Sequence, residues 1–171
     1  ERPVSFLSLP GAKDVGIEIN SLSKTFNMTG WRIGWACGNK ELISALSKVK
    51  ENIDSGVFEA IQFAGIEALT NSKETPLKMR DIYKKRMNLF VNGLKEVGFD
   101  VKFPKGTFYL WLKVNKSSVE FVDELLENGK IIATPGIGFG PSGENFVRFS
   151  LTIQENKIIE AIERIKKIWE K

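Results

Sequence analysis

Histidine is absent from this chain, and cysteine occurs once among its 171 residues. Without histidine, these residues cannot form a Ser-His-Asp or Cys-His catalytic set or a histidine-ligated zinc site. A single cysteine, Cys37, excludes an internal disulfide and a cysteine-rich metal site. We therefore expect no metal, and a cytoplasmic location is the default for such a composition. Proton transfer would have to use lysine, a carboxylate or tyrosine.

Long apolar runs and blocks of like charge are missing as well. No apolar stretch approaches the roughly 20 residues that span a bilayer, and nothing resembles a signal peptide, so we expect no membrane association. The 25 basic and 21 acidic residues are spread along the chain, with a net charge of +4. No RNP, zinc-finger or helix-turn-helix motif accompanies this mild excess of positive charge, and we expect no nucleic-acid partner.

The apolar residues, 42% of the chain, are sufficient for a real core. Their periodicity predicts a strand at 15–19, a buried strand at 33–38, a helix capped by Asn39 and ending at Ser55-Gly56, and a helix at about 58–69. The apolar face predicted for the Asn39 helix comprises Leu42, Ile43, Leu46, Val49 and Ile53. Cys37 is expected to pack in its strand as a small apolar side chain.

A long helix is predicted to begin at Thr75-Pro76 and to stop at Gly98. Strands then alternate with helices: strands at 101–103 and 108–114, a capping-box helix from Ser117 to Gly129, strands at 130–134 and 146–151, and a last helix capped by Thr152. The inward faces predicted for the last two helices carry Phe121, Val122, Leu125, Leu126, Ile158, Ile162, Ile165 and Trp169. The change of pattern predicts an α/β fold with a boundary between two structural parts.

Chemically active side chains concentrate between Ser21 and Trp35. Lys24, if buried or placed near other cations, has an amine able to form a Schiff base with a carbonyl group. Ser21 and Ser23 offer hydroxyl donors to phosphate oxygens, and Arg32 offers a planar, permanently charged fork for the same group. Gly30 and Gly34 are expected to let the backbone turn and approach a ligand. Together these residues predict a site for an anionic carbonyl cofactor.

A nucleotide-binding P-loop is a rival interpretation of Lys24-Thr25. That motif requires glycine immediately before the lysine and another glycine five residues earlier. Ser23 and Glu18 occupy those places. The P-loop interpretation is therefore excluded.

Arg148 lies within an otherwise apolar strand, Phe146 to Ser150. A charge there is costly unless it is paired or points into a cleft. We expect it to bind a substrate carboxylate with two parallel hydrogen bonds. The glycine-rich segment before it, from Pro135 to Gly143, fits either a mobile lid or a turn-rich connection. Aromatic residues that resemble a base-stacking platform are expected to serve core packing instead: Trp31, Trp35, Phe108, Tyr109 and Trp111.

The run from Asn20 to Gly38 resembles the cofactor-lysine segment of class I/II, fold-type I aminotransferases that depend on pyridoxal 5'-phosphate. Ala133 to Ser150 resembles the family segment that carries the substrate-carboxylate arginine, and Pro104 to Trp111 lies between the two motifs in the family's order. This resemblance implies that Lys24 binds the cofactor covalently and acts in catalysis. It further implies that Ser21 and Arg32, with Ser23 as an additional candidate, bind the cofactor phosphate, and that Arg148 binds the substrate.

The same resemblance implies a fold. Residues 1–72 would be the C-terminal end of the large cofactor-binding domain, with a remnant of its sheet, and residues 73–171 would be the small α+β domain. The implied activity is amino-group transfer between an amino acid and a 2-oxo acid. Asn52 to Gln62, with the lysine segment, most resembles the LL-diaminopimelate aminotransferases, which use 2-oxoglutarate and act in lysine biosynthesis.

Alternatives stay open at this stage. Aspartate and alanine aminotransferases share much of the same sequence motif. A β-elimination or acyl-transfer reaction is also compatible with Lys24 and Arg32. The family also carries a phosphate loop, an Asn, an Asp and a Tyr upstream of the lysine, for which these residues leave no room. We therefore expect a C-terminal fragment that lacks an N-terminal portion, is inactive alone, and belongs to a homodimer when intact. A fragment serving only as a non-catalytic fold module is the remaining alternative.

Overall fold

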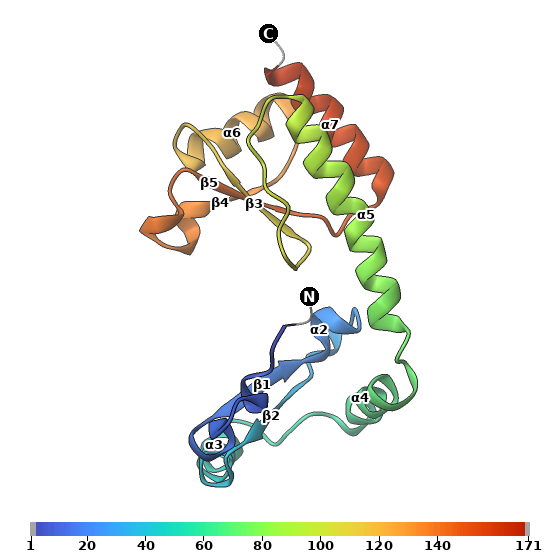
Figure 1. Ribbon diagram of the computed structural model, residues 1–171, viewed down its shortest axis with the longest axis vertical. Coiled ribbons are helices and arrows are strands. Elements are labelled where there is room, and N and C mark those ends of the chain that lie inside the picture. The colour runs from blue at the N-terminus through green and yellow to red at the C-terminus, as the bar shows by residue number, and fades with distance from the viewer. Residues whose placement is uncertain (1–2, 170–171) are drawn as a thin grey trace. The chain divides into compact units, whose positions relative to one another are not determined.

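The computed structural model describes residues 3–169, and the chain divides into two compact units, Glu1–Met79 and Arg80–Lys171 (Figure 1). This division describes compactness alone. The assignment of residues 1–72 to one domain and 73–171 to another stays a prediction. No helix within residues 3–169 is both long and apolar enough to cross a bilayer.

The first unit is built on a two-stranded antiparallel ribbon. Strands β1 (Ile17–Ser21) and β2 (Gly34–Gly38) pair with Ile17 opposite Gly38 and Ser21 opposite Gly34. The surrounding elements are η1 (Phe6–Ser8), α1 (Ala12–Val15), α2 (Leu22–Thr25), η2 (Thr29–Trp31), α3 (Lys40–Glu51), α4 (Glu59–Asn71) and the start of α5 (Thr75–Glu96). Val15, predicted to begin the first strand, instead ends α1. The prediction of a buried second strand is also wrong, because no residue of β2 is buried.

Helix α3 begins where Asn39 was predicted to cap it. The Asn39 Oδ1 accepts from Glu41 N at 2.9 Å and from Leu42 N at 3.0 Å, which satisfies two amides of the first turn. The helix ends at Glu51, earlier than predicted, and its apolar face is largely exposed. Ile53, predicted to belong to this apolar face, lies beyond the end of the helix, and no residue of α3 is buried.

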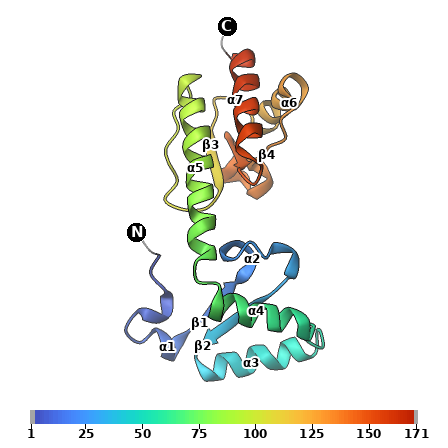
Figure 2. The same cartoon turned by 90° about the vertical axis from the view of Figure 1, so that its right-hand side faces the viewer.

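The second unit packs helices against a three-stranded antiparallel sheet of order β3-β5-β4. Its further elements are β3 (Tyr109–Lys113), α6 (Ser118–Gly129), β4 (Thr134–Pro135), η3 (Gly136–Phe139), η4 (Pro141–Gly143), β5 (Phe146–Ser150) and α7 (Glu155–Trp169). Helices α5 and α7 lie side by side in both views of the ribbon (Figures 1 and 2). Salt bridges from Lys85 to Glu155 and from Lys166 to Glu96 join them.

One face of this sheet forms the core. Alternate residues of β3 and β5 point to the same face, and those on the core face are buried together with residues of α5, α6 and α7: Met87, Phe90, Val91, Leu94, Leu110, Leu112, Phe121, Leu125, Val147, Phe149, Ile158, Ile162 and Ile165. The predicted inward face of α7 is confirmed. Leu126, predicted to face inward with Leu125, is 47% exposed.

Two predicted strands are absent or shortened. Residues 101–103 form no strand, although Val101 is buried, and β3 pairs with β5 instead. The strand predicted at 130–134 reduces to Thr134–Pro135. Helix α6 ends at Gly129 as predicted, and Lys130, with a left-handed backbone at φ 53°, is its C-cap. Sheet pairing is tertiary, which explains why local apolar content misplaced these segments.

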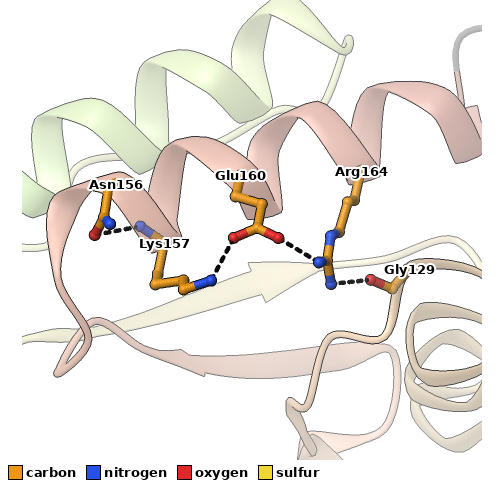
Figure 3. A network of polar contacts seen from close by, with 5 residues as sticks. All are labelled: Gly129, Asn156, Lys157, Glu160 and Arg164. Carbon is orange, nitrogen blue, oxygen red and sulfur yellow. Dashed lines mark hydrogen bonds and ion pairs between the residues drawn. The ribbon is translucent and has the colours of Figure 1, made fainter.

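A polar network fastens α7 to the end of α6 (Figure 3). Glu160 lies between Lys157, at 2.7 Å, and Arg164 on the same helix. Arg164 Nη1 also donates to the Gly129 carbonyl at 3.1 Å. The hydrogen bond from Lys157 and the charge of Arg164 lower the pKa of Glu160 below its ordinary value of 4.5. Exposed pairs of this kind contribute little stability individually, and both lie within α7, so the hydrogen bond from Arg164 to Gly129 is the contact that joins the two helices.

Candidate functional site

The ribbon places Lys24 and Arg32 on a single loop. β1 runs directly into α2, which carries Lys24, and the chain returns through η2 and Arg32 to β2. Because Ser21 pairs with Gly34, the loop leaves and returns at the same end of the ribbon. Leu22 N donates to Ile33 O at 3.3 Å and closes its base. Lys24 and Arg32 therefore flank one loop.

Hydrogen bonds run across the loop from the serines to the arginine. Ser21 Oγ caps α2 by accepting from Ser23 N at 3.1 Å. The carbonyl of Ser23 accepts from Thr29 Oγ1 at 3.0 Å, and the carbonyl of Thr29 accepts from Arg32 Nη1 at 2.9 Å. The loop therefore holds Ser21, Ser23 and Arg32 in one connected structure. Sequence reasoning missed Thr29, whose role depends on a contact across the loop.

Arg32 has an unusual backbone for its residue type. Its φ is 52°, in the left-handed region, where a side chain with a Cβ costs roughly 1–2 kcal/mol. Arg32 and Lys24 are both exposed residues. Local strain of this kind persists only where the surrounding structure holds it in place, and it concentrates at functional sites. Here the bond to Thr29 supplies part of that restraint.

The charge around the loop has one sign. Residues 21–38 contain Lys24 and Arg32 and no acidic residue. Glu18, earlier in β1, directs its carboxylate elsewhere, accepting from Ser5 Oγ at 2.5 Å and from Asn20 Nδ2 at 3.1 Å. The bond from Ser5, followed by that from Asn20, lowers the pKa of Glu18 below 4.5. An anion reaching the loop would thus meet hydroxyls and cations.

The two glycines of the loop have roles different from those predicted. A Cβ on Gly34 would lie 2.5 Å from the carbonyl oxygen of Asn20, so this glycine allows the two strands to approach each other, not a ligand to approach the backbone. A Cβ on Gly30 would meet no atom within 4 Å, and its φ lies outside the left-handed region. Neither conformation nor crowding requires glycine at position 30.

Arg148 lies in β5, in the second unit, directly opposite Trp111 of β3 and Thr134 of β4. It is on the sheet face opposite the core. Its guanidinium carbon lies 4.4 Å from the ring centroid of Tyr109 and 4.6 Å from that of Phe139. Arg148 Nε is buried and has no hydrogen-bond partner within the described residues. Sequence reasoning identified Arg148 but missed both rings.

The aromatic residues predicted to pack in the core divide into two groups. Phe108 is buried, and Tyr109 is half-buried. Trp31, Trp35 and Trp111 are exposed by about two fifths or more of their surface, so for these three the expectation of core packing is wrong. Trp111 alternates with the core residues of β3 and therefore lies on the opposite face of the sheet. Within residues 3–169, no cluster of acids and cysteine is suited to hold a metal ion.

Comparison with known proteins shows the family to which the chain belongs. The sequence profile of the family "Aminotransferase class I and II" matches residues 6–165. LL-diaminopimelate aminotransferase of Halothermothrix orenii is 53% identical over 166 residues, covering 96% of this chain and 43% of that protein. The enzyme of the same name from Aquifex aeolicus is 51% identical over 170 residues, covering 98% and 44%. The expected resemblance to this group is confirmed.

Solved structures of aminotransferases superpose on nearly the whole of this chain. BacF from Bacillus subtilis superposes with a TM-score of 0.93 at 38% identity, covering 99% of this chain and 44% of that one. An aromatic aminotransferase from Pyrococcus horikoshii superposes with a TM-score of 0.94 at 31% identity, covering 99% and 47%. The prediction of an α/β fold that forms part of a fold-type I aminotransferase is confirmed. The chain spans less than half of the length of these relatives, and it belongs to the class I and II aminotransferase family.

Proposed function

We propose that this chain is the lysine- and arginine-bearing part of a pyridoxal-phosphate-dependent aminotransferase, which transfers an amino group between an amino acid and a 2-oxo acid. The observation that carries the proposal is the loop between β1 and β2. It presents Lys24 and Arg32 together with no acidic residue between positions 21 and 38, and Thr29 links Ser23, the residue before Lys24, to Arg32 by hydrogen bonds. Its sequence lies within the region matched by the family profile.

The donors of this loop fit a phosphate monoester with an aldehyde. Arg32 spends one Nη1 bond on Thr29 and has no carboxylate partner within the described residues, which leaves donors for phosphate oxygens. Ser21 Oγ accepts from Ser23 N, and its own proton remains available for donation. Ser23 is a weaker candidate because its described contacts are made by its backbone. Lys24 would supply the amine that holds the aldehyde.

The division of labour follows from the chemistry of each group. When bound, pyridoxal phosphate supplies an electron sink for charge that develops at the substrate Cα. Lys24 Nζ, released when substrate arrives, would take the proton from Cα of the amino acid. In the reverse direction it would deliver a proton to Cα of the molecule formed from the 2-oxo acid. Arg148 would bind the substrate carboxylate through two parallel hydrogen bonds and so fix the orientation of the Cα–H bond.

We infer an LL-diaminopimelate/2-oxoglutarate type of substrate pair. The support is the name shared by the relatives that are 53% and 51% identical over nearly all of this chain. Aspartate or alanine aminotransfer is the alternative. Product analysis with glutamate and a series of oxo acids separates these reactions, and it also distinguishes amino transfer from β-elimination.

A homodimer completed by further residues is the assembly that we propose for the active form. The exposed apolar side chains of the first unit, including Ile19, Ile53 and Phe58, support it, because each is more than 70% exposed. These 171 residues alone should not turn over substrate. Measurable transamination by them alone would contradict this part of the proposal.

The decisive experiment is covalent trapping. The chain is incubated with pyridoxal phosphate, reduced with borohydride and digested, and the modified lysine is identified by mass spectrometry. Lys24 should carry the label, and Lys24→Arg should abolish it, whereas Lys40→Arg, which removes another exposed lysine of the same unit, should leave it unchanged. Arg32→Ala should raise the half-saturating concentration by roughly 10- to 100-fold, the worth of charge-assisted bonds. Labelling spread evenly over surface lysines would refute the assignment.

A further inference from the structure

Aromatic side chains surround Arg148 on the open face of the second unit's sheet. Phe139 comes from η3, whereas the others come from β3 and β5: Tyr109, Trp111 and Phe146. Trp111 stacks on Phe146 with 5.5 Å between centroids and 17° between planes, and it meets Phe139 edge-on at 5.5 Å and 73°.

The charge of Arg148 is not neutralised by the protein. Within residues 3–169 no carboxylate pairs with it, and its Nε is buried without an acceptor. Two rings instead lie against its guanidinium carbon, at 4.4 and 4.6 Å. A cation is attracted to a ring face without consuming its N–H donors. The terminal nitrogens of the guanidinium therefore keep their donors for an anion.

The ring of Phe139 is presented by a segment that is locked in place. Gly136 and Gly143 lie back to back, and a Cβ on either would fall within about 2.1 Å of the other's carbonyl oxygen. Ile137 N donates to Ser118 Oγ at 3.3 Å, and Glu144 Oε1 accepts from Ser118 N at 2.6 Å. Both ends of the segment are thus fastened to the start of α6. These contacts favour a rigid connection over the mobile lid that its glycine content left open.

We propose that Phe139 is a positioning residue for carboxylate recognition. It rests on the function proposed above, in which Arg148 binds the substrate carboxylate. Together with Tyr109, Phe139 fixes the plane of the Arg148 guanidinium, so that the two terminal nitrogens, with Nε buried, receive the carboxylate end-on. The locked segment from Gly136 to Gly143 keeps this ring in place before substrate arrives, which reduces the ordering cost of binding.

The test separates positioning from folding. In the ¹⁵N-labelled chain, the Arg148 Nε–Hε NMR signal, assigned by its loss in Arg148→Lys, reports on the rings beside it. We expect Phe139→Leu to move this signal and to raise the dissociation constant for glutarate by roughly 3- to 10-fold, the range of a partly desolvated cation–ring contact. Phe139→Tyr, which keeps the ring, should restore both. Phe103→Leu is the matched control, because Phe103 is similarly exposed and contacts Lys95 instead.

The results distinguish failure of the positioning role of Phe139 from failure of the carboxylate role of Arg148. If glutarate binds the parent chain and Arg148→Lys weakens it, but Phe139→Leu changes neither the signal nor the affinity, the positioning role is overturned and the proposed function stands. If Arg148→Lys leaves glutarate binding unchanged, or the parent chain does not bind glutarate, the carboxylate role of Arg148 fails, and the role of Phe139 fails with it. A shifted signal in Phe139→Leu with unchanged affinity also overturns the proposal.

Discussion

At the scale of single residues, Gly34 and Gly30 are the same residue type in two different surroundings. Both belong to the loop that presents Lys24 and Arg32, and both are glycines near its turn. The backbone of Asn20 crowds Gly34, whereas Gly30 faces open space. The requirement at Gly34 comes from the pairing of β1 with β2, which positions both ends of the loop.

Alanine at these two positions should therefore have different effects. Gly34→Ala puts its Cβ against backbone that cannot rotate away, so we expect a loss of about 1–3 kcal/mol, as for other overpacked sites. Gly30→Ala should change stability by less than about 0.5 kcal/mol. Urea denaturation, followed by hydrogen exchange in β1 and β2, measures both. Equal effects of the two substitutions would argue against the observed strand register.

At the scale of elements, helix α6 is capped from a distance. The sequence predicted a capping-box start at Ser117, yet the Ser117 side chain makes no capping bond. Glu144, far along the chain, accepts from Ser118 N instead. This bond lowers the pKa of Glu144 below its ordinary value of 4.5 and ties the segment that carries Phe139 to the helix.

The sign of the resulting pH dependence follows from that lowered pKa. A carboxylate whose pKa is lower in the folded state stabilises the protein above its unfolded pKa, and that stabilisation is lost as the pH falls through the folded value. Glu144→Gln should therefore be less stable than the parent near pH 7, and the difference should shrink below about pH 4. Thermal unfolding between pH 3 and 7 tests this. Glu120→Gln, in the exposed first turn of α6, is the control and should parallel the parent chain.

At the scale of the whole molecule, burial is distributed unevenly between the two units. The second unit has a large buried core, which consists of side chains from one sheet face and three helices. In the first unit, the buried cluster comprises Leu22, Met28 and Ala68, and many large apolar side chains are exposed. Local stability follows the density of buried apolar contacts. The second unit should therefore carry most of the stability of the chain.

Hydrogen exchange can test this distribution. Amides of α7 should exchange more slowly than those of α3, in which no residue is buried. Leu125→Ala should lower the free energy of opening of α5 to α7 by about 2–5 kcal/mol, since Leu125 is fully buried. Leu126→Ala, the next residue on the same helix, should cost less than about 1 kcal/mol. Comparable losses at the two positions would contradict the packing of α6.

The sequence by itself determined the local features whose physics is short-range. Asn39 as a cap, the long helix opening at Thr75, the inward isoleucines of α7, and Lys24 and Arg32 on one loop all depend on spacing and on neighbouring residues. It also indicated the family, because the lysine and arginine segments occur in order.

Only the tertiary structure decided what depends on distant partners. The pairing of β3 with β5 left residues 101–103 without a strand, and Glu144 replaced the predicted cap of α6. The rings around Arg148 come from segments separated along the chain, and no local pattern marks Phe139 as a neighbour of that guanidinium. Such contacts form when the register of a sheet brings separate segments together. The apolar strand around Arg148 and the family resemblance therefore identified this arginine but not the rings that hold it.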